Sequence, residues 1–578
     1  MKLLLLLLAF CGLSLLRCEE KFVPYDYSAT IECLEIPNKP QYNGGIILNP
    51  DLQNGSQSWS QFGNSKVDFR EFGGNKFVVA TQRNQSTDSV SQKVYLEKGI
   101  LYTFSAWLQV SIGNAPVSAV FKKNGEAMHA GSVVAESKCW SMLKGGLTVD
   151  ESGPADLYFE SENTTVEIWV DSVSLQPFTQ EEWNSHQEQR INKARKGLVR
   201  VRVVNNKGET VPNATITIEQ RRLGFPFGSA VGSNILWNQA YQNWFTKRFT
   251  VTTFENEMKW YSTEKERGRE NYTTADAMLR FFKRHGIAVR GHNVIWDHPR
   301  YQTNWVKSLS GNDLYNAVKR RVFSVVSRYK DQLAGWDVVN ENLHFSYFES
   351  KMGPKASYNI YAMAHAVDPR TTMFMNEFFT LEKPQDLAAS PARYLQKLRE
   401  LRSIQVAGKI PLGIGLESHF RIPNIPYMRS ALDTLAATGL PIWLTEIDIT
   451  APPNVRAKYF EQVLREGHAH PYVKGMVIWT AYYPPSCYQM CLTDGNFRNL
   501  PTGDVVDKLL REWGGLGTQS TGVTNADGFF EASLFHGDYD LNISHPFTNS
   551  ISSYNFTLST HDDGSTSQTQ PSIFVFSA

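Results

Sequence analysis

Two glutamates each end an apolar run and could act together as a catalytic pair of carboxyl groups. Glu341 ends the apolar run Trp336-Asp-Val-Val-Asn-Glu341, and Glu446 ends Ile442-Trp-Leu-Thr-Glu446. Cleavage of a glycosidic bond needs two carboxyl groups on opposite sides of the bond, one protonated to release the leaving oxygen and one ionised to attack the sugar or activate water. A lone carboxylate at a strand end is more often a helix cap or a surface charge, so the hypothesis depends on the two glutamates acting together.

A histidine and an aspartate accompany the second glutamate. His419 ends the run Gly415-Leu-Glu-Ser-His419, and Asp448 lies two residues beyond Glu446. If these runs are neighbouring strands, a chain of His419 and carboxylates would hold Glu446 ionised and oriented. The alternative is a histidine that satisfies a buried backbone group.

These residues need a scaffold that brings strand ends together. Eight short β-branched or aromatic runs alternate with longer amphipathic segments, at residues 227–231, 251–254, 289–296, 336–341, 372–378, 414–419, 442–449 and 476–481. This alternation predicts a (β/α)8 TIM barrel, in which reactive groups sit at the C-terminal ends of the strands. Glu341 and Glu446, on the fourth and seventh strands, would face each other across its mouth. A doubly wound open sheet is the alternative.

The segments around the barrel have a different pattern. Residues 43–178 alternate in short stretches between Gly, Asn and Ser turns, which predicts a β-sandwich. Residues 179–196 carry charges at helical spacing and predict a solvated helical linker. Residues 197–222 predict a β-hairpin, and we expect it to combine with residues 516–578 into one small β-domain. The barrel, residues 223–515, would then be inserted between the strands of that domain.

The composition favours a neutral polymer as partner. The chain has 578 residues, 42% of them apolar, which is enough for several cores. Its 58 basic and 57 acidic residues leave a net charge of +1, so no broad field attracts nucleic acid or anionic lipid. The 14 Trp and 24 Tyr include flat rings that can stack on sugars. We expect no cofactor, because two carboxyl groups supply the chemistry. No His/Cys cluster has the spacing of metal ligands, so no metal site is assigned, and a structural metal is left open.

Several features predict a secreted glycoprotein. Residues 1–18 have the pattern of a signal peptide and are too short for a membrane anchor. Four cysteines lie beyond it, of which Cys487 and Cys491 are expected to pair locally. Seven Asn-X-Ser/Thr sequons agree with this route: Asn54, Asn84, Asn163, Asn213, Asn271, Asn542 and Asn555. We expect a monomer, extracellular or in a cell wall, with no membrane partner.

Residues 223–513 resemble glycoside hydrolase family 10, the xylanases, and most closely the plant type. The resemblance rests on four ordered motifs: Phe254-Glu-Asn-Glu-Met-Lys-Trp260, Gly291-His-Asn-Val-Ile-Trp296, Trp336-Asp-Val-Val-Asn-Glu341 and Leu444-Thr-Glu-Ile-Asp448. It implies an endo-1,4-β-xylanase that retains anomeric configuration, with Glu341 as general acid/base and Glu446 as nucleophile. Their carboxyl groups would then lie about 5 to 5.5 Å apart.

The same resemblance implies a set of substrate-binding residues, which Asp448 would support. Eight residues match xylose-binding positions of the family: Glu255, Asn256, Lys259, His292, Trp296, Asn340, His419 and Trp479. Asn340 would hydrogen-bond the sugar 2-hydroxyl, and that bond is expected to strengthen in the transition state. Trp479 would form the floor of the subsite beside the cleavage point. An exposed salt bridge is the alternative account of Glu255 and Lys259.

Three positions depart from the family pattern. Asp297 and Glu417 stand where many microbial relatives carry His and Gln. A second Trp expected after Trp479 is absent, and we expect Tyr488, in the loop between Cys487 and Cys491, to replace that ring.

Residues 43–178 resemble a carbohydrate-binding module of family 22. The resemblance rests on Leu48-Asn-Pro-Asp-Leu-Gln-Asn-Gly55, the stretch from Tyr102 to Trp107, and Trp169-Val-Asp-Ser-Val-Ser-Leu175. It implies a xylan-binding groove, with Arg83 and Glu160 as the binding Arg and Glu. A sandwich whose aromatic rings are all core is the alternative.

Two further functions remain open beside a hydrolase of cell-wall xylan. A xylan endotransglycosylase would use the same covalent intermediate, because only the acceptor differs. A non-catalytic xylan-binding wall protein would keep the sandwich and a vestigial barrel. Retention of Glu341, Asn340, His419 and Glu446 counts against the last.

Overall fold

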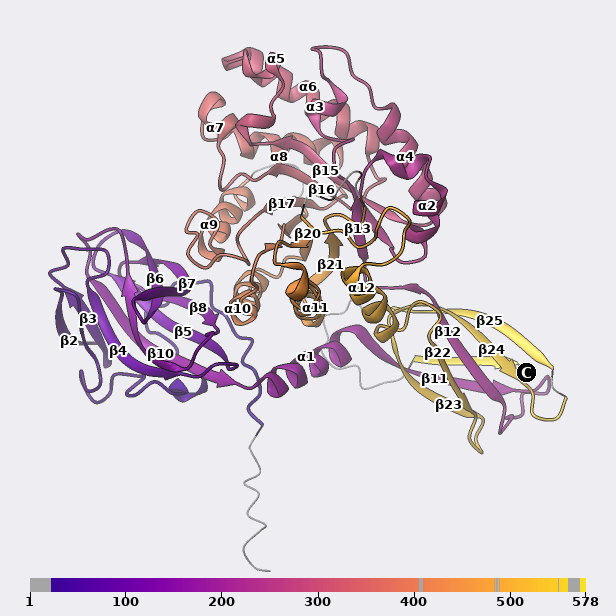
Figure 1. Ribbon diagram of the computed structural model, residues 1–578, viewed down its shortest axis with the longest axis horizontal. Coiled ribbons are helices and arrows are strands. Elements are labelled where there is room, and N and C mark those ends of the chain that lie inside the picture. The colour runs from indigo at the N-terminus through magenta and orange to yellow at the C-terminus, as the bar shows by residue number, and fades with distance from the viewer. Residues whose placement is uncertain are drawn as a thin grey trace, which may run out of the picture.

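The computed structural model describes residues 22–404, 409–482, 484, 487, 489–548, 550–559 and 572–577. The predicted signal peptide lies outside these residues. Three bodies follow one another in Figure 1, with a β-sandwich and a small β-domain at opposite ends of the long axis and a helix-covered barrel above and between them.

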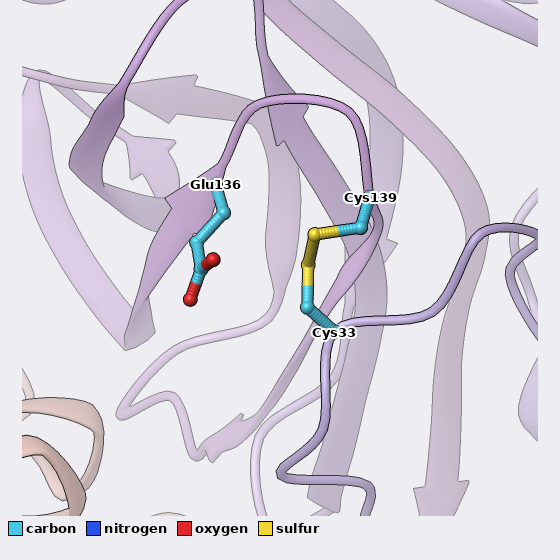
Figure 2. A group of neighbouring side chains, drawn as sticks. All are labelled: Cys33, Glu136 and Cys139. Atoms are coloured by element: carbon cyan, nitrogen blue, oxygen red, sulfur yellow. A yellow bond between two sulfur atoms is a disulfide. The ribbon is translucent and has the colours of Figure 1, made fainter.

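The sandwich consists of two five-stranded sheets, ordered β1-β4-β9-β6-β7 and β2-β3-β10-β5-β8, all of whose pairs are antiparallel. Its strands are β1 (Ser60–Phe62), β2 (Lys66–Phe72), β3 (Asn75–Thr81), β4 (Ser89–Leu96), β5 (Leu101–Val110), β6 (Asn114–Lys123), β7 (Glu126–Glu136), β8 (Ser141–Leu147), β9 (Gly153–Glu160) and β10 (Ile168–Phe178). Apolar side chains from both sheets form a core of their own. A disulfide joins Cys33, in the segment before the sandwich, to Cys139 after β7 (Figure 2).

The barrel closes through eight parallel strands. They are β13 (Phe227–Val231), β14 (Val251–Phe254), β15 (Ala288–Trp296), β16 (Gly335–Asn340), β17 (Met373–Glu377), β18 (Leu412–Leu416), β20 (Ile442–Ile449) and β21 (Val473–Ile478). The first strand pairs with both the second and the last, β14 and β21. The short β19 (His419–Phe420) continues the sixth strand beside β20. The predicted (β/α)8 fold is confirmed, and strands such as β14, β16 and β20 are buried along their whole length because both faces of the sheet are covered.

Helices cover the outside of the barrel. They are α2 (Gln239–Thr246), α3 (Trp260–Thr263), α4 (Thr273–Arg284), α5 (Asn304–Lys307), α6 (Gly311–Tyr329), α7 (Tyr347–Met352), α8 (Ala356–Val367), α9 (Pro391–Arg402), α10 (Ile425–Ala436), α11 (Pro453–Ala469) and α12 (Pro501–Glu512). In α4 the buried residues Ala275, Met278, Leu279 and Phe282 recur at helical spacing, which is why this segment is a helix with one apolar face. Within the described residues, none of these helices is both long and apolar enough to span a bilayer.

The small β-domain is built from both sides of the barrel. One sheet has the order β23-β11-β26 and the other β22-β12-β24-β25. The strands are β11 (Lys196–Val204), β12 (Thr215–Leu223), β22 (Gln519–Val523), β23 (Phe529–Phe535), β24 (Gly537–Ser544), β25 (Ile551–Leu558) and β26 (Ser572–Ser577). The barrel therefore lies, in sequence, between strands that pair with one another.

The predicted hairpin at residues 197–222 is wrong. β11 pairs with β23 and β26, whereas β12 pairs with β22 and β24 in the opposite sheet. The chain folds back in a short turn, where Val204 forms an antiparallel bridge with Thr210 and the N–H of Val211 donates to Val203 O at 3.0 Å, before it crosses over. Alternation of buried and exposed residues is the same in a hairpin and in two facing sheets, so the pattern by itself cannot separate them.

The predicted linker is a helix, but it is not solvated. Helix α1 (Gln180–Arg195) starts with a capping box in which Thr179 and Glu182 bond to each other's backbone N–H groups. Trp183 is buried where α1 packs against α11 of the barrel, and His186 is buried against the segment before the sandwich, where its Nε2 atom lies 2.8 Å from Val23 O. This segment therefore joins the three bodies as a structural element, and Figure 1 shows it running between the sandwich and the small β-domain.

Candidate active site

The two predicted catalytic glutamates come from the fourth and seventh strands of the barrel. Glu341 directly follows β16, and Glu446 lies within β20. Glu341 has φ 59°, a left-handed conformation in which its backbone N–H donates to Asn376 O on the next strand. The exposed fractions of Glu341 and Glu446 are 8% and 6%, so both carboxyl groups are largely removed from water.

The environment of Glu341 favours its protonated form. Burial raises the pKa of its carboxyl group, and the charges of Glu377 and Glu446 raise it further, to about 8, against the opposing effects of Trp296 and Lys259. At neutral pH the group holds a proton and can act as an acid.

The environment of Glu446 favours its ionised form. Burial by itself raises the pKa of this carboxyl group, but His292, His419 and Lys259 lower it to about 2. His292 Nε2 lies 3.9 Å from Glu446 Oε1, and His419 Nε2 lies 3.6 Å from Oε2. The Nδ2 atom of Asn376 donates to Oε1 at 3.2 Å. Glu446 is thus an oriented carboxylate.

A second layer of carboxylates fixes both histidines. The Nδ1 atom of His292 lies 2.9 Å from Asp337 Oδ2, and that of His419 lies 3.0 Å from Asp448 Oδ1. Each ring is oriented so that its Nε2 atom faces Glu446. The structure therefore brings His419 and Asp448 together with Glu446, through the strand pairing of β19 with β20.

Aromatic rings and a lysine surround the carboxyl pair. Lys259 Nζ lies 4.5 Å from the ring centre of Trp296 and 5.7 Å from that of Trp479. The ring of His292 meets Trp479 edge-on at 5.5 Å. Trp296 and Trp479 are only half-buried, so part of each is open to a ligand. Trp296 also stacks on Tyr301 at 4.1 Å.

The remaining predicted binding residues lie beside this group. Glu255 accepts from Thr480 Oγ1 at 2.8 Å, and burial raises its pKa to about 7. Tyr261 donates to Asn256 Oδ1, and Asn376 donates to Asn340 Oδ1 at 2.9 Å. These bonds set the direction of each amide.

Comparison with known proteins identifies the family. A model of glycosyl hydrolase family 10 matches residues 218–487, and a model of a carbohydrate-binding domain matches residues 44–165. Endo-1,4-beta-xylanase 5 of Arabidopsis thaliana is 44% identical over 478 residues, which cover 81% of this chain and 83% of that protein. Endo-1,4-beta-xylanase 5-like of Arabidopsis thaliana is 40% identical to this chain over 538 residues, which cover 91% of each protein.

The chain belongs to glycosyl hydrolase family 10. It is therefore a glycoside hydrolase, with a carbohydrate-binding domain before the barrel.

Solved structures with a similar fold include two bacterial xylanases. Xylanase 10B of Thermotoga petrophila, in complex with xylobiose, is 23% identical and covers 50% of this chain and 94% of its own, with a TM-score of 0.44. The N-terminal modules of Clostridium thermocellum endo-1,4-beta-D-xylanase 10B, with xylohexaose, are 15% identical and cover 82% of this chain and 98% of their own, with a TM-score of 0.42.

Sequence reasoning missed two residues of this family 10 site, Asn376 and Glu377, at the end of β17. Asn376 Nδ2 lies 2.9 Å from Asn340 Oδ1 and 3.2 Å from oxygens of both Glu417 and Glu446. Glu377 accepts from the backbone N–H of Leu343 at 2.7 Å and faces Glu341 closely enough to raise its pKa. The sequence could have indicated both residues, because reactive groups are expected at the C-terminal end of every barrel strand, including the fifth.

The positions that depart from the family pattern have different environments. Asp297 is fully buried and accepts from Asn342 at 2.7 Å and from the backbone of Phe348 at 2.9 Å, which is a structural role. Glu417 lies close to Glu446, where it accepts a hydrogen bond from Asn376 and faces His419. The disulfide between Cys487 and Cys491 is confirmed. Tyr488 lies outside the described residues.

Two clusters in the described part of the chain have the side-chain types of metal ligands. In the first, Cys33 and Cys139 are joined in a disulfide beside Glu136, so neither sulfur is a thiolate (Figure 2). The second comprises Glu417, His419 and Glu446. The pKa of His419 is raised well above its usual range, because Asp448, Glu417 and Glu446 outweigh its burial. His419 therefore serves as a cation among these carboxyl groups, and its Nδ1 atom is held by Asp448 at 3.0 Å.

Arg83 and Glu160, the two residues predicted to bind sugar in the carbohydrate-binding domain, differ in how far their side chains are buried and bonded. Arg83 is buried, and all five of its N–H groups donate to backbone carbonyl oxygens of residues 86, 88, 161, 163 and 166. This geometry supports a structural role for Arg83 and not the predicted sugar contact. Glu160 is half-buried and bonds to His129 at 2.8 Å and Tyr158 at 3.2 Å, beside the stacked rings of Phe62 and Tyr158.

Proposed function

We propose that this protein is a secreted endo-1,4-β-xylanase that hydrolyses internal bonds of cell-wall xylan with retention of configuration. The observation that supports it most directly is the unequal environment of the two carboxyl groups. The pKa of Glu341 is raised to about 8 and that of Glu446 is lowered to about 2, so one is an acid and the other an anion over the same pH range.

In the proposed reaction, Glu446 attacks the anomeric carbon while Glu341 gives its proton to the leaving oxygen. The glycosidic bond breaks as an ester bond to Glu446 forms. Glu341, now ionised, then removes a proton from water, whose oxygen attacks the same carbon and releases Glu446. His292 and His419 hold the Glu446 carboxylate in place through both steps.

The proposal of xylan as substrate rests on the relatives and on the polar residues around the carboxyl pair. The curated relatives in Arabidopsis thaliana bear the name endo-1,4-beta-xylanase. Glu255, Asn256 and Lys259 offer acceptors and a cation suited to sugar hydroxyl groups, and Asn340 is oriented for the 2-hydroxyl. The preceding domain is proposed to be a family 22 module that binds the same polymer, with Glu160 among its ligands.

Release of reducing sugar from xylan tests the catalytic pair. We expect Glu446→Ala to lower the rate by at least about a thousandfold and Glu341→Gln by about a hundredfold or more on substrates with poor leaving groups. Glu461→Gln, which alters a carboxyl group on the outer face of α11, serves as the control with unchanged activity. Equal release by wild type and Glu446→Ala would remove the proposed mechanism.

The anomer formed first tests retention. Proton NMR of the reaction mixture should show the β-anomer before mutarotation, because two displacements restore the starting configuration. An initial α-anomer would contradict a covalent intermediate on Glu446. A labelled acceptor sugar in the same experiment separates hydrolysis from transfer, since transfer lengthens the acceptor.

A further inference from the structure

A third carboxyl group lies inside the proposed catalytic centre. Glu417 follows β18 and is 3% exposed. Its Oε1 atom accepts from Asn376 Nδ2 at 3.2 Å, and its Oε2 atom lies 3.4 Å from His419 Nε2. The same two nitrogen atoms face Glu446, at 3.2 Å and 3.6 Å. Glu417 and Glu446 therefore compete for one set of donors.

These donors carry too few hydrogens for two carboxylates. The Asn376 amide has two N–H hydrogens, but three oxygens surround its nitrogen, from Asn340, Glu417 and Glu446. The Nε2 atom of His419 has one hydrogen for two carboxyl groups, because Nδ1 is bonded to Asp448. Once Asn340 takes one Asn376 hydrogen, two hydrogens remain, one on Asn376 and one on His419. If Glu417 and Glu446 were both ionised, these two hydrogens would be divided between two buried anions, whereas a neutral Glu417 leaves both to Glu446.

The charges around Glu417 point the same way. Glu446 on β20 repels a charge on it, as does Glu341 after β16 when that group is ionised, whereas His419 on β19 attracts one. Lys259, just before α3, is the other nearby cation and is shared with three further carboxyl groups, those of Glu255, Glu341 and Glu446. Burial and the two like charges raise the pKa of Glu417 well above its usual range despite His419.

The other acidic groups beside Glu417 are already bonded elsewhere. Glu377 on β17 bonds to His344 Nδ1 at 2.7 Å, although its backbone carbonyl accepts from the N–H of Glu417. Glu382 accepts from the backbone N–H of His419 at 2.7 Å. Neither adds a cation to balance a charge on Glu417.

We propose that Glu417 is a positioning residue that stays protonated during turnover, so that the N–H donors of Asn376 and His419 are directed to the Glu446 carboxylate. Neutral Glu417 also keeps a second anion away from Glu341. If Glu417 lost its proton, it would attract the N–H groups of Asn376 and His419 away from Glu446. The second anion would also change the pKa values of Glu341 and Glu446. This inference rests on the proposed function only for its kinetic readout.

Replacement by the neutral amide of the same shape gives the kinetic test. In the wild type, kcat/KM on xylan is expected to fall at high pH as Glu341 loses its proton, which gives the alkaline limb of the pH profile. We expect Glu417→Gln to leave this alkaline limb in place or to move it to higher pH. If Glu417 were ionised in the wild type, removing its charge would lower the pKa of Glu341 and move the alkaline limb to lower pH. Such a downward shift, or a loss of about a hundredfold or more at about pH 6, would overturn the proposal.

Two controls separate this effect from general damage. Glu461→Gln makes the same chemical change on the outer face of α11 and should leave the pH profile unchanged. Circular dichroism and the thermal midpoint show whether Glu417→Gln folds like the wild type.

A measurement on the wild-type protein needs neither a variant nor activity. Neutron diffraction from deuterium-exchanged crystals grown near neutral pH should show a deuteron on a carboxyl oxygen of Glu417 and none on Glu446. A bare Glu417 carboxylate would overturn the proposal even if the enzyme cleaves xylan. A deuterated Glu417 in a protein that does not cleave xylan would instead refute the proposed function alone.

Discussion

At the scale of single residues, the site separates two chemically identical side chains by their surroundings. Glu341 is buried beside the carboxyl groups of Glu377 and Glu446, whereas Glu446 meets two imidazoles held by aspartates. Lys259 acts on both, and lowers the pKa of each carboxyl group. The proposed roles of acid and nucleophile therefore follow from the neighbours of each glutamate and not from residue type.

The pH profile of kcat/KM tests this division. We expect activity to fall as the pH rises through about 8, because Glu341 loses its proton, and as the pH falls toward about 2, because Glu446 gains one. Measurement of kcat/KM on xylan across this range gives the acid limb and the alkaline limb of the profile. The pKa values at these two limbs belong to Glu341 and Glu446 as a coupled pair. An enzyme that gains activity above the Glu341 pKa would contradict the assignment.

Lys259→Met provides a directional test of the same electrostatics. Removal of this cation should shift both limbs to higher pH, because Lys259 lowers the pKa of Glu341 and of Glu446. The absolute rate is also expected to fall if Lys259 binds substrate, so the positions of the limbs are the quantity to compare. Limbs that move apart or stay fixed would contradict the proposed influence of Lys259.

At the scale of elements, α1 shows how a polar helix is held in place. Trp183 and Gln187 on α1 donate to Glu466 Oε2 at 2.9 and 2.8 Å. The guanidinium of Arg429, on α10, donates to both oxygens of Glu466 at 2.6 and 2.9 Å. Glu466 lies on α11 and is 1% exposed, so three helices meet at one buried carboxylate.

Two glutamates on α11 allow a matched stability test. Glu466→Ala leaves Arg429 buried without its partner and should lower the free energy of unfolding by about 3 to 5 kcal/mol. Glu461→Ala removes a partly exposed partner of Arg465 and Lys508 and should cost less than about 1 kcal/mol. Urea unfolding followed by Trp fluorescence compares them, and equal losses would show that the buried cluster contributes nothing special.

At the scale of the whole molecule, the sandwich is docked on the barrel. Lys144 on β8 lies 2.8 Å from Asp433 on α10, and both side chains are at most 2% exposed. Tyr25 and His470 also bond to Asp433. A Cβ atom at Gly146 would lie 2.5 Å from Pro426, so only glycine lets β8 approach α10 this closely.

Lys144→Met tests whether this contact fixes the domains. It leaves Asp433 buried without its lysine, which should weaken the interface by about 3 to 5 kcal/mol. We expect a larger radius of gyration in small-angle X-ray scattering and a separate unfolding transition for the sandwich. Lys93→Met, on the exposed face of β4, is the control. Scattering curves that coincide for all three proteins would show that the ion pair does not hold the domains together.

The sequence by itself determined the types of element and the residues at their ends. Eight apolar runs predicted eight barrel strands, because parallel strands buried on both faces leave a continuous apolar signature. The motif around Glu341 placed it directly after its strand, as the structure has it, whereas Glu446, predicted to end its strand, lies inside β20, which continues to Ile449. The pairing of Cys487 with Cys491 also followed from their short separation.

Only the tertiary structure decided which surfaces meet. The polar pattern of α1 is equally compatible with water and with a buried carboxylate, and the alternation in β11 and β12 is equally compatible with a hairpin and with two facing sheets. The two donors that Glu417 and Glu446 share likewise come from different strands, Asn376 from β17 and His419 from β19. Such contacts join residues far apart along the chain, and periodicity reports only on neighbours within one element.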